Sequence, residues 1–161
     1  MLRFHKLIVM EKIVKIVLIS FFVLISGSTS MYAGNADDNA NDSGIDWTPV
    51  MNAIMQVESG GDRFAKSGNS VGAMQITPIC VLECNNILKR RKNKKRFKLS
   101  DRFSIAKSKE MFLLLQSVYN PMNSIEKAIR SWNGGLNYGV KKTQRYFEKV
   151  MRVMNQNLAC N

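Results

Sequence analysis

The sequence predicts a mainly α-helical single domain of about five helices with at most a minor hairpin. Apolar residues recur at three- and four-residue steps along several segments, as in amphipathic helices. Residues that start and end helices flank these segments, and the alternating pattern of strands is nearly absent. The 161 residues are 45% hydrophobic and 22% charged, which is typical of one globular domain with a real core.

The N-terminal segment has the composition of a secretory signal peptide. Four basic residues precede an apolar run over 16–25, and small residues follow it. This run is about half as long as a membrane-spanning helix requires. We therefore expect residues 1–33 to be a signal peptide and the protein to be exported to the periplasm or cell envelope; a retained membrane anchor is the alternative. The composition of residues 34–46 predicts a flexible leader, and the domain is expected over 47–161.

The charge of the chain favours a polyanionic partner. The formal net charge is +12, and removal of residues 1–33 takes away four basic residues and one acidic residue, leaving +9. Eight of the ten residues in Lys89–Lys98 are Lys or Arg. We expect this run to bind an anionic wall or membrane surface, unless it is only a solvated, mobile loop. No nucleic acid is expected, because Phe97 is the one aromatic residue among these charges and does not make a stacking platform.

The cysteines offer no catalytic or metal chemistry. Cys80, Cys84 and Cys160 follow the predicted signal peptide, while the one histidine, His5, lies within it. A zinc site of His and Cys ligands and a Cys–His nucleophile pair are therefore both excluded from the exported chain. We expect no metal and no cofactor.

The first helix should begin at Thr48-Pro49, where a hydroxyl cap precedes Pro at the first helical position. Val50, Ile54 and Val57 then form one apolar stripe, and Gly60-Gly61 should end the helix. Glu58 falls in the last turn, where its charge faces the negative end of the helix dipole. A structural role explains this position poorly, so we expect a functional one.

The rest of the chain predicts a loop and four further helices. Residues 62–76 are rich in Gly, Ser and Asn and predict a loop with a short extended turn. Thr77-Pro78 repeats the cap signal and begins a helix with apolar Ile79, Leu82, Ile87 and Leu88. The remaining helices are expected at 104–119, from a capping box of Asn123 and Glu126 to 133–135, and at about 142–155.

Four segments carry a family resemblance. They are Glu58-Ser59-Gly60-Gly61, Gly72 to Pro78, Trp132-Asn133-Gly134-Gly135, and Thr143 to Tyr146. In this order the chain from about 47 to 150 resembles the soluble lytic transglycosylase (SLT) domain family, a relative of goose-type lysozyme. Ala73, Trp132 and Gly134 depart mildly from the family's usual Leu, Tyr and Ala, and the basic run has no counterpart.

The resemblance implies a lysozyme-like fold and an enzyme that cleaves peptidoglycan glycan strands. The bond is the β-1,4 link between N-acetylmuramic acid and N-acetylglucosamine, and the product is 1,6-anhydro-N-acetylmuramic acid. One glutamate, here Glu58, would act as both acid and base. Substrate-binding roles fall on the matching positions: Ser59 orients the carboxylate or binds substrate, Met74 lines the cleft, Gln75 binds sugar amide groups, Asn133 contacts substrate or braces its loop, and Tyr146 donates a hydrogen bond near Glu58.

Glycoside cleavage requires an acid that is still protonated near neutral pH. Burial raises the pKa of a glutamate, so a buried Glu58 would suit this reaction. Two alternatives stay open. A muramidase would add water to the same bond and would use a second carboxylate, for which Asp62 is the nearest candidate in sequence. A non-catalytic peptidoglycan-binding module of a secretion or conjugation apparatus would keep the fold alone, but it has no need of Glu58.

Overall fold

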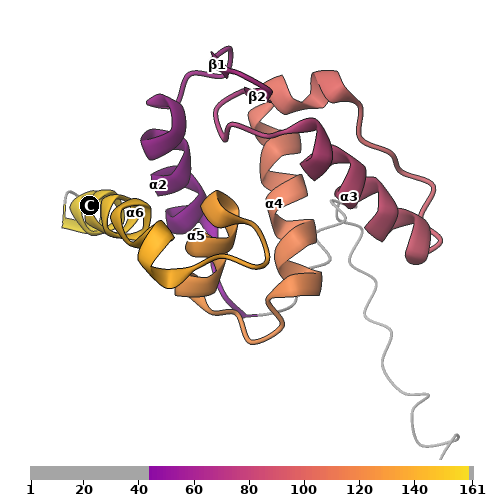
Figure 1. Cartoon of the computed structure of the whole chain (residues 1–161). Coiled ribbons are helices and arrows are strands. Elements are labelled where there is room, and N and C mark those ends of the chain that lie inside the picture. The colour runs from indigo at the N-terminus through magenta and orange to yellow at the C-terminus, as the bar shows by residue number, and fades with distance from the viewer. Residues whose placement is uncertain (1–43, 160–161) are drawn as a thin grey trace, which may run out of the picture. The chain divides into compact units, whose positions relative to one another are not determined.

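The structure, a computed structural model, describes residues 44–159 (Figure 1). The predicted signal peptide, 1–33, and most of the predicted leader, 34–46, lie outside the described residues. None of the helices in the described range is long and apolar enough to cross a membrane.

The described part of the chain is mainly helical, which confirms the predicted fold class. Five α-helices, one 3-10 helix and a hairpin of two-residue strands follow one another along the chain. Their bounds are α2 Thr48–Ser59, β1 Lys66–Ser67, β2 Ser70–Val71, α3 Pro78–Arg90, η1 Leu99–Phe103, α4 Ile105–Tyr119, α5 Ile125–Gly134 and α6 Val140–Ala159.

The first helix starts one residue earlier than its predicted cap allows. Thr48 is already helical, and its backbone N–H donates to the Asp46 carboxylate at 2.8 Å, so Asp46 rather than the Thr48 hydroxyl satisfies the free end of the helix. The predicted end is confirmed. Gly60 adopts a left-handed conformation, with φ of 65°, and its N–H donates to Gln56 O at 3.0 Å.

The predicted N-cap of α3 is confirmed, and the predicted N-cap of α5 is wrong. The Thr77 hydroxyl accepts a hydrogen bond from Cys80 N at 3.2 Å, as the Thr-Pro pair predicted for α3. At α5 the cap is Ser124, whose hydroxyl accepts from Lys127 N at 3.2 Å, whereas Asn123 lies one residue outside with φ of 53°.

Of the four apolar residues noted in the sequence of α3, Ile87 and Leu88 are buried but Ile79 and Leu82 are not. Ile79 and Leu82 are 77% and 60% exposed, while Val81, Cys84 and Ile87 are buried. The stripe that starts at Val81 is inward because α3 packs against α4, and this choice between two apolar stripes is made by the neighbouring helix.

A short hairpin and the 3-10 helix hold the loop that follows α2. Lys66 pairs with Val71 and Ser67 with Ser70, and Val71 also bridges Ile76. Arg102 of η1 donates to Asn69 O at 3.1 Å and to Ile76 O at 3.2 Å. The segment after the basic run therefore fixes the loop that carries residues 72–76.

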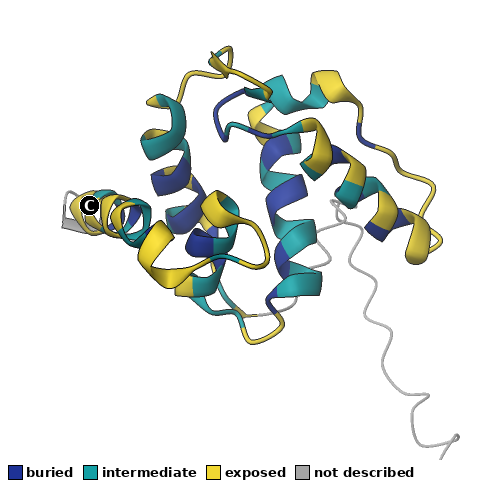
Figure 2. Cartoon of the chain, in the orientation of Figure 1, coloured by how far each residue is buried: buried dark blue, intermediate teal, exposed yellow. Residues whose placement is uncertain are grey.

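One apolar core joins α2, α3, α4, α5 and α6 (Figure 2). The Phe112 ring of α4 lies at its centre, 5.8 Å from the Trp47 ring and 5.3 Å from the Trp132 ring. α6 packs mainly on α2 and α5, whereas α3 packs on α4. These two groups of helices both contribute to the cleft described next.

Candidate active site

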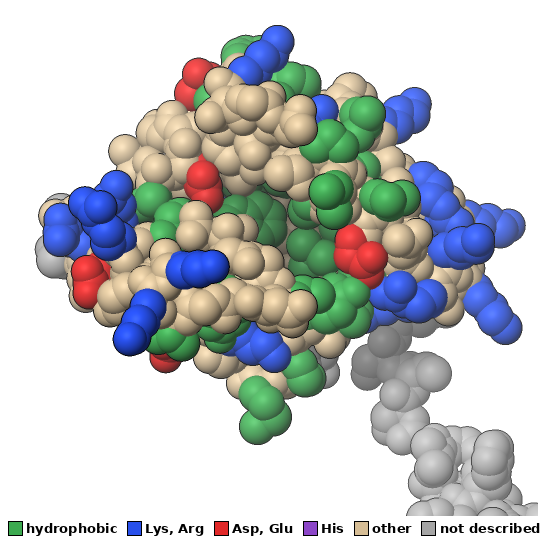
Figure 3. Space-filling model, in the orientation of Figure 1, with side chains coloured by type: hydrophobic (Ala, Val, Ile, Leu, Met, Phe, Trp, Pro, Cys, Tyr) green, Lys and Arg blue, Asp and Glu red, His purple; other side chains and the backbone are tan. Residues whose placement is uncertain are grey.

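A cleft of about 520 Å³ opens on the face shown in Figure 3, with apolar side chains on its floor and acidic side chains on two sides. It is lined by the end of α2, the hairpin and its following loop, the first turns of α3, the last turns of α4 and the end of α5. Glu58 and Glu83 are the acidic residues of this lining.

Glu58 lies in the last turn of α2, next to the left-handed Gly60 that ends the helix. Its side chain is half-buried, and burial raises the pKa of its carboxyl, because the charged form loses hydration. A hydrogen bond from Tyr146 opposes this shift and lowers the pKa by a smaller amount. The site thus holds an acid that keeps its proton to a higher pH than an exposed glutamate does.

Tyr146 comes to this acid from α6. Its hydroxyl donates to Glu58 Oε1 at 2.8 Å, between residues 88 positions apart in the chain. Burial, followed by the charge of Glu58, raises the pKa of the Tyr146 hydroxyl, so it stays protonated and remains a donor at all ordinary pH values. The structure brings these two predicted site residues into direct contact.

A buried arginine fixes the position of α6. Arg130 of α5 is 3% exposed and donates to Glu126 at 2.7 Å, to the Thr143 hydroxyl at 3.2 Å and to Gln144 at 2.8 Å. Two of these partners lie on α6 within three residues of Tyr146. Arg130 was not predicted as a functional residue from the sequence, although a charged residue within the strongly amphipathic segment of α5 is a signal of such a role.

Ser59 binds backbone rather than the carboxylate. Its hydroxyl donates to Ala73 O at 2.9 Å and to Met55 O at 3.3 Å. The first bond ties the end of α2 to the loop after the hairpin. Ser59 therefore positions Glu58 through the backbone, and no contact between the Ser59 hydroxyl and the carboxylate is found.

In the loop after the hairpin, Gln75 lines the cleft and Met74 does not. Gln75 has φ of 50°, and its side-chain amide donates to Gly72 O at 2.9 Å and to Ala65 O at 3.4 Å. The Met74 side chain is fully buried in the core and does not line the cleft, contrary to the expectation. Its carbonyl accepts from Trp132 Nε1 at 3.2 Å, so it braces the cleft wall from behind.

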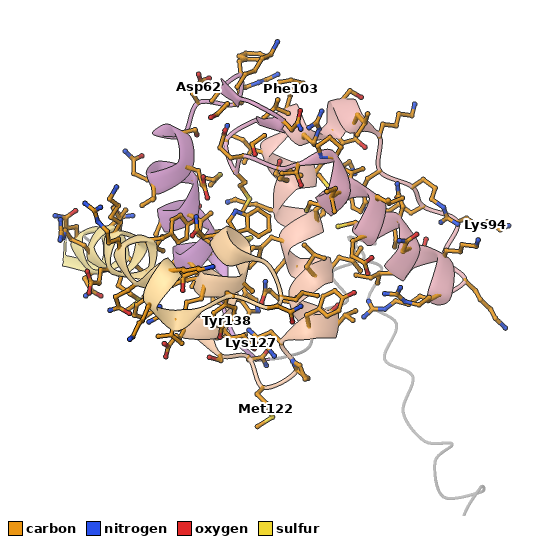
Figure 4. All side chains as sticks on the ribbon, viewed as in Figure 1. Asp62, Lys94, Phe103, Met122, Lys127 and Tyr138 are labelled. Atoms are coloured by element: carbon orange, nitrogen blue, oxygen red, sulfur yellow. The ribbon has the colours of Figure 1, made fainter. Side chains whose placement is uncertain are left out.

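Asn133 is an exposed residue of the cleft lining at the end of α5. Asp62, the second carboxylate considered from sequence, is not in the lining. It lies on the loop beside β1 at the outer edge of the domain, where it accepts a hydrogen bond from Phe64 N at 2.8 Å (Figure 4). Its role in this structure is to cap a turn.

Glu83 and Tyr119 line the cleft away from Glu58 and were not singled out from the sequence. Glu83 accepts a short hydrogen bond from the Tyr119 hydroxyl, which lowers the pKa of its carboxyl, and it also pairs with Arg90 at 3.0 Å. The signal was weak, because a single Glu on an exposed helix usually marks only a solvated face.

The basic run Lys89–Lys98 forms the end of α3 and the segment that follows. The backbone of Phe97 exchanges hydrogen bonds of 2.8 and 2.9 Å with Asn85, and its ring is buried. Lys95 pairs with Glu110, while Lys94 points away from the domain (Figure 4). The run is therefore held at several points, since Arg90 also pairs with Glu83 and Arg91 donates to Ser117 at 3.0 Å, while Lys92 and Lys94 are exposed.

Comparison with known families agrees with this site. Residues 35–155 match the family model of the transglycosylase SLT domain. No curated protein and no solved structure matches the chain at a comparable level. Because the match spans most of the 161 residues, the chain belongs to the transglycosylase SLT domain family.

Proposed function

We propose that the protein is an exported peptidoglycan lytic transglycosylase that uses Glu58 as its single acid and base. The observation that carries this proposal is the state of Glu58: half-buried at the side of a cleft, with a raised pKa and a hydrogen bond from a tyrosine. Family membership supports the substrate class, since the SLT domain is a transglycosylase domain.

In the first step, protonated Glu58 donates its proton to the bridging oxygen of the glycosidic bond. The bond between C1 of N-acetylmuramic acid and that oxygen breaks, and N-acetylglucosamine leaves with its 4-hydroxyl restored. The raised pKa favours this step, because at any given pH a larger fraction of Glu58 carries its proton than in an exposed glutamate.

In the second step, the Glu58 carboxylate takes the proton of the 6-hydroxyl on the same muramic acid. The oxygen of that hydroxyl closes onto C1, which gives the 1,6-anhydro sugar and returns the proton to Glu58. No water is consumed. The Tyr146 hydroxyl stabilises the carboxylate between the two steps and holds the direction of Oε1.

Hydrolysis is the competing outcome, and it would use a second carboxylate close to the bond. Asp62 is absent from the cleft lining and caps a turn. Glu83 is in the lining, but Tyr119, Arg90 and Asn86 all donate to it, which leaves little of its carboxylate for attack on a sugar carbon. These contacts favour the mechanism with one acid.

Mass spectrometry of the products tests the proposal. Purified protein, Glu58→Gln and the control Glu110→Gln, an acidic residue of α4 outside the cleft, are each incubated with purified sacculi. We expect anhydro-muropeptides from the wild type and from Glu110→Gln, and none from Glu58→Gln. Reducing-end products, heavier by one water, would establish a muramidase. Sacculi that are bound but not cleaved by any variant would identify a wall-binding module.

We also propose that the basic run binds an anionic wall or membrane surface and that the enzyme opens the wall locally for a secretion or conjugation apparatus. Lys92 and Lys94 are exposed and form no ion pair with any residue of 44–159, so they are the charges to reverse. Retention of Lys92→Glu/Lys94→Glu on sacculi and on anionic vesicles at low salt should fall several-fold. Unchanged retention on both would contradict the adhesion.

A further inference from the structure

The wall of the cleft built by α3 and α4 carries polar groups that the proposed cleavage does not use. Glu83 on α3 and Gln116 and Tyr119 on α4 all line the cleft. Gln116 and Tyr119 are three residues apart and so share one face of α4. We call these three residues the α3–α4 site.

Gln116 offers the cleft a side-chain donor that bonds to no other described residue. The residue is 5% exposed, and its side-chain oxygen accepts a hydrogen bond from Asn120 at 3.1 Å. Its side-chain nitrogen donates to no group within residues 44–159, and the residue lines the cleft. This nitrogen is not enclosed, because in residues 44–159 only the Trp47 indole nitrogen is a fully buried side-chain polar atom without a partner, so the Gln116 donor is open to a ligand in the cleft.

Glu83 supplies a fixed acceptor in the same cleft lining. The Tyr119 hydroxyl, Arg90 at 3.0 Å and Asn86 at 3.3 Å hold its carboxylate in place. A carboxylate has about four acceptor positions, so about one remains, and the side chain is 31% exposed. The site thus offers one N–H donor and one carboxylate acceptor, both held by neighbours.

We propose that the α3–α4 site binds the acetamido group of a sugar in the glycan strand, with Gln116 donating to its carbonyl and Glu83 accepting from its N–H. This inference rests on the proposed function. An acetamido group carries one acceptor and one donor, which matches the unused pair.

The charges of the site favour this neutral ligand over an amine of the stem peptide. Arg90 already balances the charge of Glu83, so a second cation gains little there. The neighbouring lining residues Ile79, Leu115 and Tyr119 are apolar or aromatic and suit the C–H face of a sugar ring.

Nuclear magnetic resonance titration of the Glu58→Gln protein tests the site without cleavage. The probes are chitohexaose, which has acetamido groups but no peptide, and cellohexaose, which has neither. We expect chitohexaose to shift the amide signals of Glu83, Gln116 and Tyr119 and to bind at least several-fold more tightly than cellohexaose. Glu83→Gln should weaken chitohexaose binding roughly tenfold, while the control Glu110→Gln should leave it unchanged.

Three results would overturn the site. They are equal binding of the two sugars, shifts confined to the Glu58 side of the cleft, or shifts of Glu83 and Gln116 caused by a free stem peptide but not by chitohexaose. The shifts of the amide signals are measured on protein with native Glu83. They therefore test the site even if Glu83→Gln folds poorly. Failure of the proposed function would be seen separately, as sacculi left uncleaved by the wild type.

Discussion

The Tyr146 hydroxyl donates a hydrogen bond of 2.8 Å to Glu58 Oε1 and thereby joins α6 to the last turn of α2. Burial of Glu58 raises the pKa of its carboxyl, while this bond lowers it. The two effects act on different forms of the residue, because burial favours the protonated acid and the bond favours the carboxylate. A group that must serve first as acid and then as base needs both.

Glu58 should reduce the stability of the fold at alkaline pH. Because its pKa is raised in the folded protein, the folded state binds more protons than the unfolded state between the two pKa values, and stability falls as pH rises through this window. Glu58→Gln should therefore have a higher Tm than the wild type at pH 8 and a smaller advantage at pH 4, by differential scanning calorimetry.

Glu83→Gln is the control with the opposite sign. The hydrogen bond from Tyr119 lowers the pKa of Glu83, so its stabilisation is present at neutral pH and is lost as pH falls through the lowered pKa. This variant should be the less stable protein at pH 8, with the difference shrinking toward pH 3. A Tm advantage of Glu58→Gln that is the same at both pH values would contradict a raised Glu58 pKa.

Tyr146→Phe should slow cleavage and shift its pH dependence. Loss of the hydrogen bond removes the influence that lowers the Glu58 pKa, so the alkaline limb of kcat/KM should move to higher pH. We expect kcat to fall roughly tenfold, the effect of one hydrogen bond to a charged group. Turbidity assays on sacculi from pH 4 to 9 measure both effects. Tyr138→Phe, outside the cleft lining, is the matched control, and an unmoved limb in Tyr146→Phe would count against the contact.

Arg130 should be a major source of stability. Its side chain is 4% exposed, joins α5 to α6 and lies 4.3 Å over the Phe147 ring. Arg130→Met leaves the α6 acceptors without their donor and should cost about 3 kcal/mol in urea unfolding. Arg130→Lys should recover little, because an ammonium group cannot reach several partners in one plane. The exposed Arg152→Met should cost under about 0.5 kcal/mol, and an equal loss in both variants would contradict this role.

Gly72→Ala should disrupt the loop that carries Gln75. A Cβ at Gly72 would lie 1.9 Å from Arg102 O, and its φ is 81°. We expect a loss of about 2–3 kcal/mol and a large loss of activity. Gly68→Ala is the matched control, since its φ is 56° but no atom lies within 4 Å of the added Cβ, and it should cost about 1 kcal/mol. Chemical unfolding measures the loss of stability in each variant, and the sacculus assay measures the loss of activity. The difference between the two variants separates the contact with Arg102 from the strain of a positive φ.

The ends of helices were predictable where the cap is local. Thr77 and Gly60 satisfy backbone groups within a few residues of themselves, so sequence spacing was sufficient. The same reasoning placed the caps at Thr48 and Asn123, each one residue from the observed N-caps, Trp47 and Ser124, and at the first helix it is the Asp46 carboxylate that accepts from the helix end. Adjacent polar residues can each serve as a cap, and the path of the entering chain chooses between them.

By itself, the sequence determined the helical class, the position of Glu58 at a helix end and the order of the motifs that mark the family, because these depend on spacing along the chain. Only the tertiary structure decided which side chains meet. It buried Met74 in the core and turned Glu83 toward the cleft, and it supplied the contact between Tyr146 and Glu58 that only the family resemblance had implied. Such contacts depend on which face each helix buries, and that face is chosen by the neighbouring helices, over separations that no local pattern encodes.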